Sequence, residues 1–412
     1  MNNYINFSSS IFFIMLGLAI PLSIAASSVL IGLICVCWIF DGKWSNKLKE
    51  IKSNNWIISI ILLIFLYLIG MLWGDSHENA PGTFQALALF LMFIVLNTSN
   101  YSNNTLKLGA LMFLLSTLFS AIIATLINFD LLLPLHNYTS IISDPNNSIY
   151  KNAIDQKPAF TNYNYHGILL SFSCLIYIFL IAKRKEWKTI FLILFFLICF
   201  FNIFNEAGRT GQLISILTLM IYSIYSFKKN IFSGIAILGF LMISIYYLFQ
   251  YSDVFKNRVI YTVNALKNEL FHSGKMEREK HSKYVRLEMI KETLSLIKEK
   301  PILGYGTGSF PSIFKEKKKY ITSLRGEITT PHNTYLFIWF EIGIIGLIIF
   351  LSILFYQIRS LIKLKYGFHR ILLPILYGVA ICFDAYMFSF ITALLYIYLF
   401  TIYKNFDFID KR

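Results

Sequence analysis

The chain has 412 residues, of which 56% are hydrophobic and 14% are charged, and its formal net charge is +15. A soluble domain carries about 25% charged residues and spreads its apolar residues at helix or strand period, so this composition excludes a soluble globular fold. No zinc-finger or RNA-binding signature accompanies the basic charge, which argues against a nucleic-acid-binding protein. The five cysteines lie inside apolar runs, so we predict no disulfides and no metal cluster.

Apolar runs long enough to cross a bilayer follow one another along the chain. Residues 7–40 as one helix would measure about 50 Å, longer than a hydrocarbon core of about 30 Å. Pro21 lies in the middle of this run, so we predict two short helices there. Ten further spans are predicted near residues 56–73, 84–97, 107–127, 164–182, 189–205, 210–227, 230–250, 333–357, 369–386 and 388–404.

Lysine and arginine gather in alternate loops of this pattern. The basic loops are segments 41–55, 183–188, 228–229 and 359–370. The positive-inside rule places them, and both termini, in the cytoplasm. The short loop with Asp75 and Glu78 then lies on the outer side. The predicted fold is an all-α polytopic membrane protein with about twelve transmembrane helices.

Two predicted outer segments are long, and they define the predicted domains. Residues 1–250 form nine spans that include the outer loop 128–163, residues 251–332 form one large outer loop, and residues 333–412 form three spans and a cytoplasmic C-terminus. The large loop contains sixteen Lys or Arg and nine Asp or Glu. Its positive charge favours an anionic partner, although a solvated lysine-rich surface is the simpler alternative.

The large loop contains a predicted helix at residues 284–300. Its apolar residues recur at three- and four-residue steps, which is typical of a helix lying on the bundle or the membrane surface. They are Leu287, Ile290, Leu294 and Ile297. Arg286 on this helix could bind a phosphate bidentately, whereas an ion pair with Glu288 or Glu292 is the simpler interpretation. The following segment 301–310 has three alternate glycines but no P-loop spacing, so we favour a structural turn.

Two polar positions lie at predicted outer ends of spans. Arg209 begins a span, where its charge opposes the helix dipole; it could hold an anionic group, snorkel, or pair with Glu206. His332 lies at the outer mouth of the tenth span, where it could act as a base near neutral pH or simply sit at the interface.

Two acids fall within predicted spans, where carboxylates are costly and often functional. We favour a structural role for Glu341 and leave the role of Asp384 open. No D-x-D motif occurs; the nearest match is Glu277 to Glu279. If a diphosphate leaves in the reaction, arginines must replace the metal that such motifs hold.

Together these features resemble the O-antigen ligase/polymerase superfamily of bacterial envelope proteins. The family pattern H-[NSQ]-x9-G-x-x-G is matched by His332-Asn333 followed by Gly343 and Gly346. Arg209 matches the family arginine that begins an outer-facing helix. Arg286 matches the loop arginine ahead of P-x-x-G-x-G-x-G-x-F, which segment 301–310 fits. Segment 160–164 is similar to the family N-P-N stretch, with Tyr163 in place of proline.

The resemblance implies an inner-membrane glycosyltransferase that uses an undecaprenyl-diphosphate-linked glycan on the periplasmic face, with no metal or other cofactor. Ligases transfer the glycan to lipid A–core, and polymerases transfer it to another repeat unit. On this basis Arg209 and Arg286 are predicted to bind the diphosphate and stabilise its charge. His332 is predicted to be the base, and Asn333 and Asp384 to bind substrate.

The single dominant outer loop before the tenth span favours a ligase, because polymerases tend to have two comparable outer loops. The polymerase remains the nearest alternative. A polyisoprenoid-glycan flippase is a different class, but it would need a charged cavity through several spans, and these spans contain few charges.

Single-cysteine labelling tests the predicted orientation. Probes in segments 41–55, 183–188 and 359–370 should be shielded from membrane-impermeant thiol reagents in intact spheroplasts, because the basic loops are cytoplasmic. Probes near residues 140 and 270 should react. Reaction at residue 185 would reverse the orientation and place His332 on the cytoplasmic side.

Overall fold

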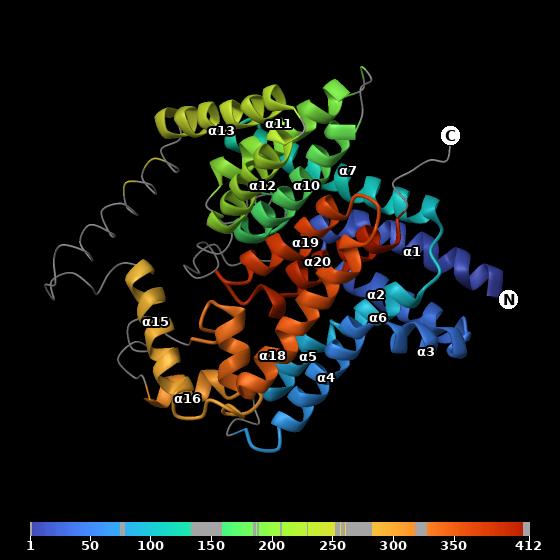
Figure 1. The fold of residues 1–412 in the computed structure, drawn as a ribbon, viewed down its shortest axis with the longest axis vertical. Coiled ribbons are helices and arrows are strands. Elements are labelled where there is room, and N and C mark those ends of the chain that lie inside the picture. The colour runs from blue at the N-terminus through green and yellow to red at the C-terminus, as the bar shows by residue number, and fades with distance from the viewer. Residues whose placement is uncertain are drawn as a thin grey trace, which may run out of the picture. The chain divides into compact units, whose positions relative to one another are not determined.

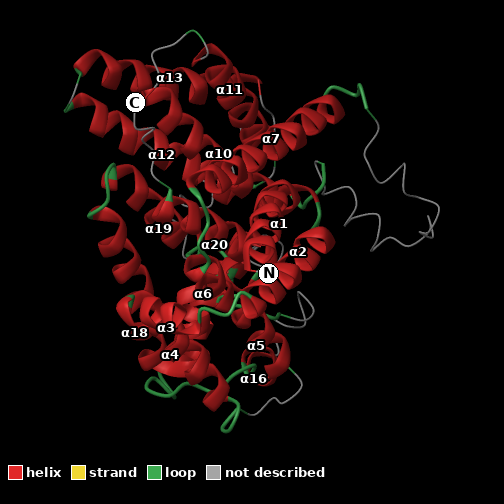
Figure 2. Ribbon diagram, turned by 90° about the vertical axis from the view of Figure 1, so that its right-hand side faces the viewer, coloured by secondary structure: helices red, strands yellow, loops and turns green. Residues whose placement is uncertain are grey.

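The computed structural model describes residues 2–74, 79–132, 159–183, 189–206, 208–228, 230–251, 282–317 and 328–406, together with residues 187, 256 and 260. Within these residues the regular secondary structure is entirely helical (Figures 1 and 2). The α-helices are α1 (Asn2–Leu22), α2 (Ile24–Phe40), α3 (Trp44–Ser53), α4 (Asn55–Gly70), α5 (Ala80–Ala88), α6 (Leu91–Thr98), α7 (Asn103–Asn128), α10 (Tyr163–Lys183), α11 (Thr189–Asn205), α12 (Arg209–Phe227), α13 (Ile231–Tyr251), α15 (Ser282–Ile297), α16 (Phe310–Lys317), α18 (Thr334–Ile362), α19 (Gly367–Ala380) and α20 (Phe390–Asn405). A short 3₁₀ helix, η1 (Tyr386–Phe388), precedes α20.

A helix or a helix pair lies at each of the twelve predicted spans. Six described segments, with α5 and α6 taken together, are long and apolar enough to cross a membrane, and the bent pair α2 and α3 raises this number to seven. The all-α membrane fold is therefore confirmed for the described residues. The count of twelve spans and the outer position of the large loop stay predictions.

The apolar run at residues 7–40 forms two helices, as its length predicts. Helix α1 ends at Leu22, just beyond Pro21, and α2 begins at Ile24. Two helices therefore replace the single long helix that would have exceeded the bilayer.

Backbone contacts divide the chain into two compact units. The first contains Met1–Phe13, Ser28–Lys107 and Lys275–Arg412, and the second contains Ile14–Ser27 and Leu108–Gly274. The first unit thus joins helices from both ends of the chain, with α18 packed along α4 and against α19 (Figure 1). In the second unit α10 packs against α11 and α12, and α12 packs against α13. The predicted boundaries at residues 250 and 332 stay predictions.

Helix α18 is interrupted at Ile342 and Gly343, whose backbone angles are not helical. The break deprives carbonyls of their normal partners four residues later, and buried backbone groups must be satisfied. Segment 301–306 supplies the replacements. The hydrogen bonds are Tyr305 N to Phe340 O (2.9 Å), Gly306 N to Glu341 O (2.7 Å) and Ile344 N to Pro301 O (2.9 Å). The segment that precedes α16 thus supplies the hydrogen-bond partners that are missing at the break in α18.

Two glycines make this arrangement sterically possible. Gly343 has φ of 68°, and a Cβ there would lie 1.9 Å from the carbonyl oxygen of Ile302. Gly306 has φ of 98°, and a Cβ there would lie 2.3 Å from Cα of Gly74. Only glycine combines a left-handed backbone with such close approach. The structural interpretation of the glycine-rich segment is therefore supported. The close approach of Ile302 explains why a glycine is needed at position 343 of the family pattern.

Glu341, for which the sequence favoured a structural role, also holds this segment. Its side chain is fully buried, and Oε1 accepts a hydrogen bond from Gly308 N at 2.9 Å. The carboxylate thus binds backbone from the glycine-rich segment, as the structural interpretation expects.

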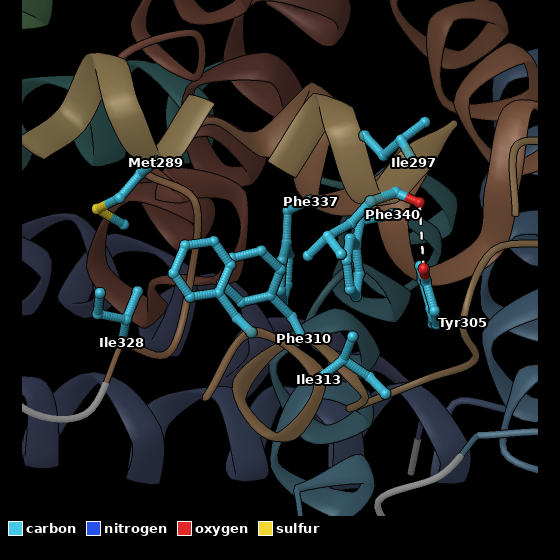
Figure 3. Close-up of a cluster of buried hydrophobic side chains, with 10 residues drawn as sticks. Met289, Ile297, Tyr305, Phe310, Ile313, Ile328, Phe337 and Phe340 are labelled. Atoms are coloured by element: carbon cyan, nitrogen blue, oxygen red, sulfur yellow. Dashed lines mark hydrogen bonds between the residues drawn. The ribbon is translucent and has the colours of Figure 1, made fainter. Parts of the chain in front are cut away.

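An apolar cluster holds α15 and α16 on α18 (Figure 3). Figure 3 shows the rings of Phe310, Phe337 and Phe340 at its centre. The Tyr305 hydroxyl lies 3.2 Å from Leu296 O and 3.0 Å from Glu299 Oε2, and its one proton is shared between these two acceptors. Burial raises the pKa of Tyr305, and the neighbouring Glu299 raises it further, so the hydroxyl remains a proton donor.

The buried face of α15 differs from the predicted one. Its buried residues among those described are Met289, Thr293, Leu296 and Ile297. Only Ile297 belongs to the predicted face, while Ile290 and Leu294 are half-buried. Leu294 of the predicted face packs against the same cluster as Ile297, so the predicted and buried faces overlap, and Met289 and Leu296 widen the buried one.

Replacing Gly343 by alanine should lower the free energy of unfolding by at least about 2 kcal/mol. A left-handed non-glycine residue costs about 1–2 kcal/mol, and the clash with Ile302 adds to this cost. The matched control is Gly32→Ala in α2, where a Cβ would meet no atom within 4 Å; it should stabilise by up to about 1 kcal/mol. Thermal unfolding in detergent measures both, and an unchanged melting temperature for Gly343→Ala would contradict the packing.

Candidate functional site

His332 lies directly before α18 and contacts Asp384, which is 52 residues away in the sequence. His332 Nδ1 and Asp384 Oδ1 are 2.9 Å apart, and the two side chains are 38% and 24% exposed. An ionised carboxylate can only accept, so Nδ1 donates this hydrogen bond and Nε2 keeps its lone pair. A partly exposed imidazole in this tautomer can take a proton from a hydroxyl.

Residues 381–385, which follow α19, are fixed to the start of α18. Three hydrogen bonds join the two segments: Thr334 N to Ile381 O (2.9 Å), Thr334 Oγ1 to Asp384 O (3.1 Å) and Asn333 Nδ2 to Cys382 O (3.0 Å). Asp384 Oδ1 also accepts from Ala385 N at 2.8 Å. The carboxylate is therefore held in place by backbone contacts as well as by His332.

The backbone of His332 is left-handed, with φ of 51°. Such a conformation is unfavourable for a residue with a Cβ and persists only where surrounding contacts enforce it. The contacts of Asn333, Thr334 and Asp384 supply that constraint. The turn therefore directs the imidazole toward Asp384 at a local energetic cost, which is typical of functional positions.

Asn333 caps α18. Its Oδ1 accepts from Leu336 N at 3.0 Å, and its Nδ2 donates to Cys382 O at 3.0 Å. Capping satisfies one of the free N–H groups at the helix start. Both ends of the amide thus have partners within the chain, and the predicted substrate contact of Asn333 stays a prediction.

Arg209 is the first residue of α12 in the second unit, and its side chain is exposed. Glu206, the local partner considered for Arg209, places Oε1 2.6 Å from Nδ1 of His166. His166 carries no motif in the sequence and was missed there. Arg286 lies in α15 of the first unit, but its side chain is outside the described residues. The diphosphate-binding roles of both arginines stay predictions.

The departure from the family N-P-N stretch is structurally tolerated. Tyr163, which replaces proline, is the first residue of α10, a position where proline is favoured but not required. Asn162 precedes it and accepts a hydrogen bond from Asn164 N through Oδ1 at 2.9 Å. The helix start is thus stabilised by an asparagine side chain.

The sequence identified His332 and Asp384 separately but did not predict their pairing. Asp384 was expected to bind substrate, and no spacing in the chain links it to His332. The structure brings His332, Asn333 and Asp384 together in the first unit. No group of three or more His, Cys, Asp or Glu able to hold a metal occurs among the described residues.

Comparison with known families matches residues 194–351 to a family described as O-Antigen ligase. The matched segment includes Arg209, Arg286, His332 and the broken region of α18. No curated protein matches the chain. Members of the matched family are glycosyltransferase-like enzymes of O-antigen biosynthesis. The chain therefore contains several helices apolar and long enough to cross a membrane, and its residues 194–351 are similar to the O-antigen ligase family.

Proposed function

We propose that this protein is an O-antigen ligase, which transfers a glycan from undecaprenyl diphosphate to lipid A–core on the periplasmic face of the inner membrane. The observation that carries the proposal is the pair of His332 and Asp384, located at the family motif. The pair combines an imidazole, a carboxylate that orients it and partial exposure of both side chains. These are the elements that a hydroxyl acceptor requires for activation.

In the proposed reaction the acceptor sugar hydroxyl gives its proton to Nε2 of His332. Its oxygen bonds to the anomeric carbon of the donor glycan, and the bond from that carbon to the diphosphate breaks. Undecaprenyl diphosphate leaves with the bonding electrons, and attack from the opposite face inverts the anomeric centre. Asp384 stabilises the imidazolium that forms, because its carboxylate already accepts from Nδ1.

Arg209 and Arg286 are proposed to bind the donor diphosphate. A guanidinium binds phosphate oxygens bidentately and remains charged at any physiological pH. Such donors stabilise the negative charge that develops on the leaving diphosphate. The exposed guanidinium of Arg209 at the start of α12 is consistent with this assignment, and no metal is required for it.

The ligase is preferred to the polymerase because the sequence predicts one dominant outer loop, with an excess of lysine and arginine. A basic loop suits the phosphates of lipid A–core.

Deletion of the gene separates ligase from polymerase. A ligase-deficient strain should show core-only lipopolysaccharide on gels and should accumulate long glycan on undecaprenyl diphosphate. Core capped by a single repeat unit would instead identify a polymerase and contradict the proposal. Single repeats retained on the inner face would identify a flippase.

Substitution of His332 tests the proposed base. Asparagine tolerates the left-handed backbone, so His332→Asn removes the base without new strain. Transfer should fall by about 10²–10⁴-fold, the usual contribution of a general base, while donor affinity should remain near that of the wild type. Asp384→Ala should cause a smaller loss, since Nε2 remains present.

The matched control is Cys382→Ala, which leaves the backbone carbonyl that accepts from Asn333. This variant should transfer glycan at the wild-type rate. The proposal for His332 is wrong if His332→Asn loses donor affinity while bound donor still reacts at the normal rate. That result would make His332 a phosphate ligand.

A further inference from the structure

A row of three buried polar side chains crosses the second unit without a role in the proposed reaction. Ser120 of α7 lies 2.9 Å through Oγ from Nε2 of His166, and Nδ1 of His166 lies 2.6 Å from Oε1 of Glu206. Ser120 and His166 are fully buried, and Glu206 is 5% exposed. The row joins α7, the first turn of α10 and the turn between α11 and α12.

The order serine, histidine, acid has the connectivity of a hydrolase triad, but the surroundings exclude that chemistry. A nucleophile must be reached by its substrate and needs donors for a developing oxyanion. Ser120 is fully buried in the interior of α7. A role inside the fold, exerted through the residues that the row holds, is the alternative that its burial allows.

Glu206, at one end of the row, lies three residues before Arg209. Its side chain is held by His166, and its backbone is held as well, because Gln212 Nε2 donates to Glu206 O at 3.1 Å and to Ile203 O at 3.3 Å. The carbonyls at the end of α11 are thus tied to the first turn of α12. These contacts fix the turn from which Arg209 projects.

A second set of contacts fixes the same turn independently. A Cβ on Gly211 would lie 2.4 Å from the carbonyl oxygen of Gly167, and a Cβ on Gly208 would lie 2.7 Å from that of Tyr163. The first turn of α12 therefore lies directly on the first turn of α10. His166 lies in that turn of α10 beside Gly167, so its bond to Glu206 sets how the start of α12 sits on α10.

We propose that Ser120, His166 and Glu206 form a positioning network for Arg209, and that they determine donor affinity without touching the donor. The inference rests on the proposed role of Arg209 as a ligand of the donor diphosphate. Ser120 fixes the ring of His166, His166 fixes the carboxylate of Glu206, and Glu206 fixes the turn that carries Arg209. The network holds the turn in place before binding, so the guanidinium of Arg209 loses less conformational entropy when it binds a phosphate.

The burial of the pair predicts how its variants behave. An unpaired buried polar group is costly, whereas removal of both His166 and Glu206 leaves neither member of this pair without the other. Glu206 Oε2 has no hydrogen-bond partner among the described residues, so the bond through Oε1 is the main anchor of the carboxylate. Single and double variants should therefore be non-additive, as expected for residues that act through one mutual contact.

The test measures the affinity of purified full-length protein for undecaprenyl diphosphate. His166→Ala, Glu206→Ala and the double variant should each bind roughly three- to tenfold more weakly, the range expected for one lost hydrogen bond. Glu206→Gln should retain most of the affinity, because its amide oxygen still accepts from Nδ1. In the Arg209→Ala background, the His166 substitution should produce no further loss.

The matched control is Ser173→Ala. Ser173 donates to Thr117 Oγ1 at 2.9 Å, and this buried bond joins the same two helices, α10 and α7, away from the Arg209 turn. The affinity of Ser173→Ala for undecaprenyl diphosphate should equal that of the wild type. Should the alanine variants fail to fold, Glu206→Asp keeps the charge but withdraws the carboxylate from His166, and it should show the same weakening.

Three outcomes overturn the inference, and they distinguish its failure from a failure of the proposed role of Arg209. Wild-type affinity in His166→Ala, with lost affinity in Arg209→Ala, overturns the positioning role alone. Equal weakening by His166→Ala with and without Arg209 also overturns it, since a general structural defect would act in both backgrounds. Unchanged affinity in Arg209→Ala overturns the donor role of Arg209, and the positioning inference falls with it.

Discussion

The break in α18 is the constraint on which the first unit depends. Backbone groups buried in a membrane protein must find partners within the protein, because no water is available to replace them. The carbonyls of Phe340 and Glu341 and the N–H of Ile344 find theirs in segment 301–306. A sequence segment that follows α15 is thereby fixed against a membrane helix, and α15 and α16 pack onto the same helix through the aromatic cluster.

The candidate site lies at the start of the same helix. The start of α18 carries His332 in a left-handed turn, and it is tied to residues 381–385 by hydrogen bonds from Asn333 and Thr334. The pattern His332-Asn333 with Gly343 and Gly346 therefore describes two features of one helix. Its first end carries His332 and the Asn333 cap, and its interior Gly343 admits the segment that holds the helix in place.

Much of this arrangement was predictable from local chemistry. Apolar length located every helix that was expected to span the membrane, and Pro21 marked the division between α1 and α2. The break at Gly343 was not predicted, because residues 333–357 form one continuous apolar run in the sequence. The contact between His332 and Asp384 was not predictable, because it joins residues 52 apart and depends on how α19 turns back. The buried face of α15 was predicted only in part, because Met289 and Leu296 also pack into the aromatic cluster, which the period of the apolar residues does not show. The partner of Glu206 was missed since His166 stands alone in an apolar run.

The most direct test of the proposed function is glycan transfer by the purified protein in excess chelator, with an undecaprenyl-diphosphate-linked glycan as donor and lipid A–core and free repeat-unit donors as competing acceptors. The account predicts that glycan appears on lipid A–core at an undiminished rate, because His332 and the two arginines supply the chemistry. Glycan lengthened on the polyprenyl carrier, or transfer that returns only when Mg²⁺ or Mn²⁺ is added, would contradict it.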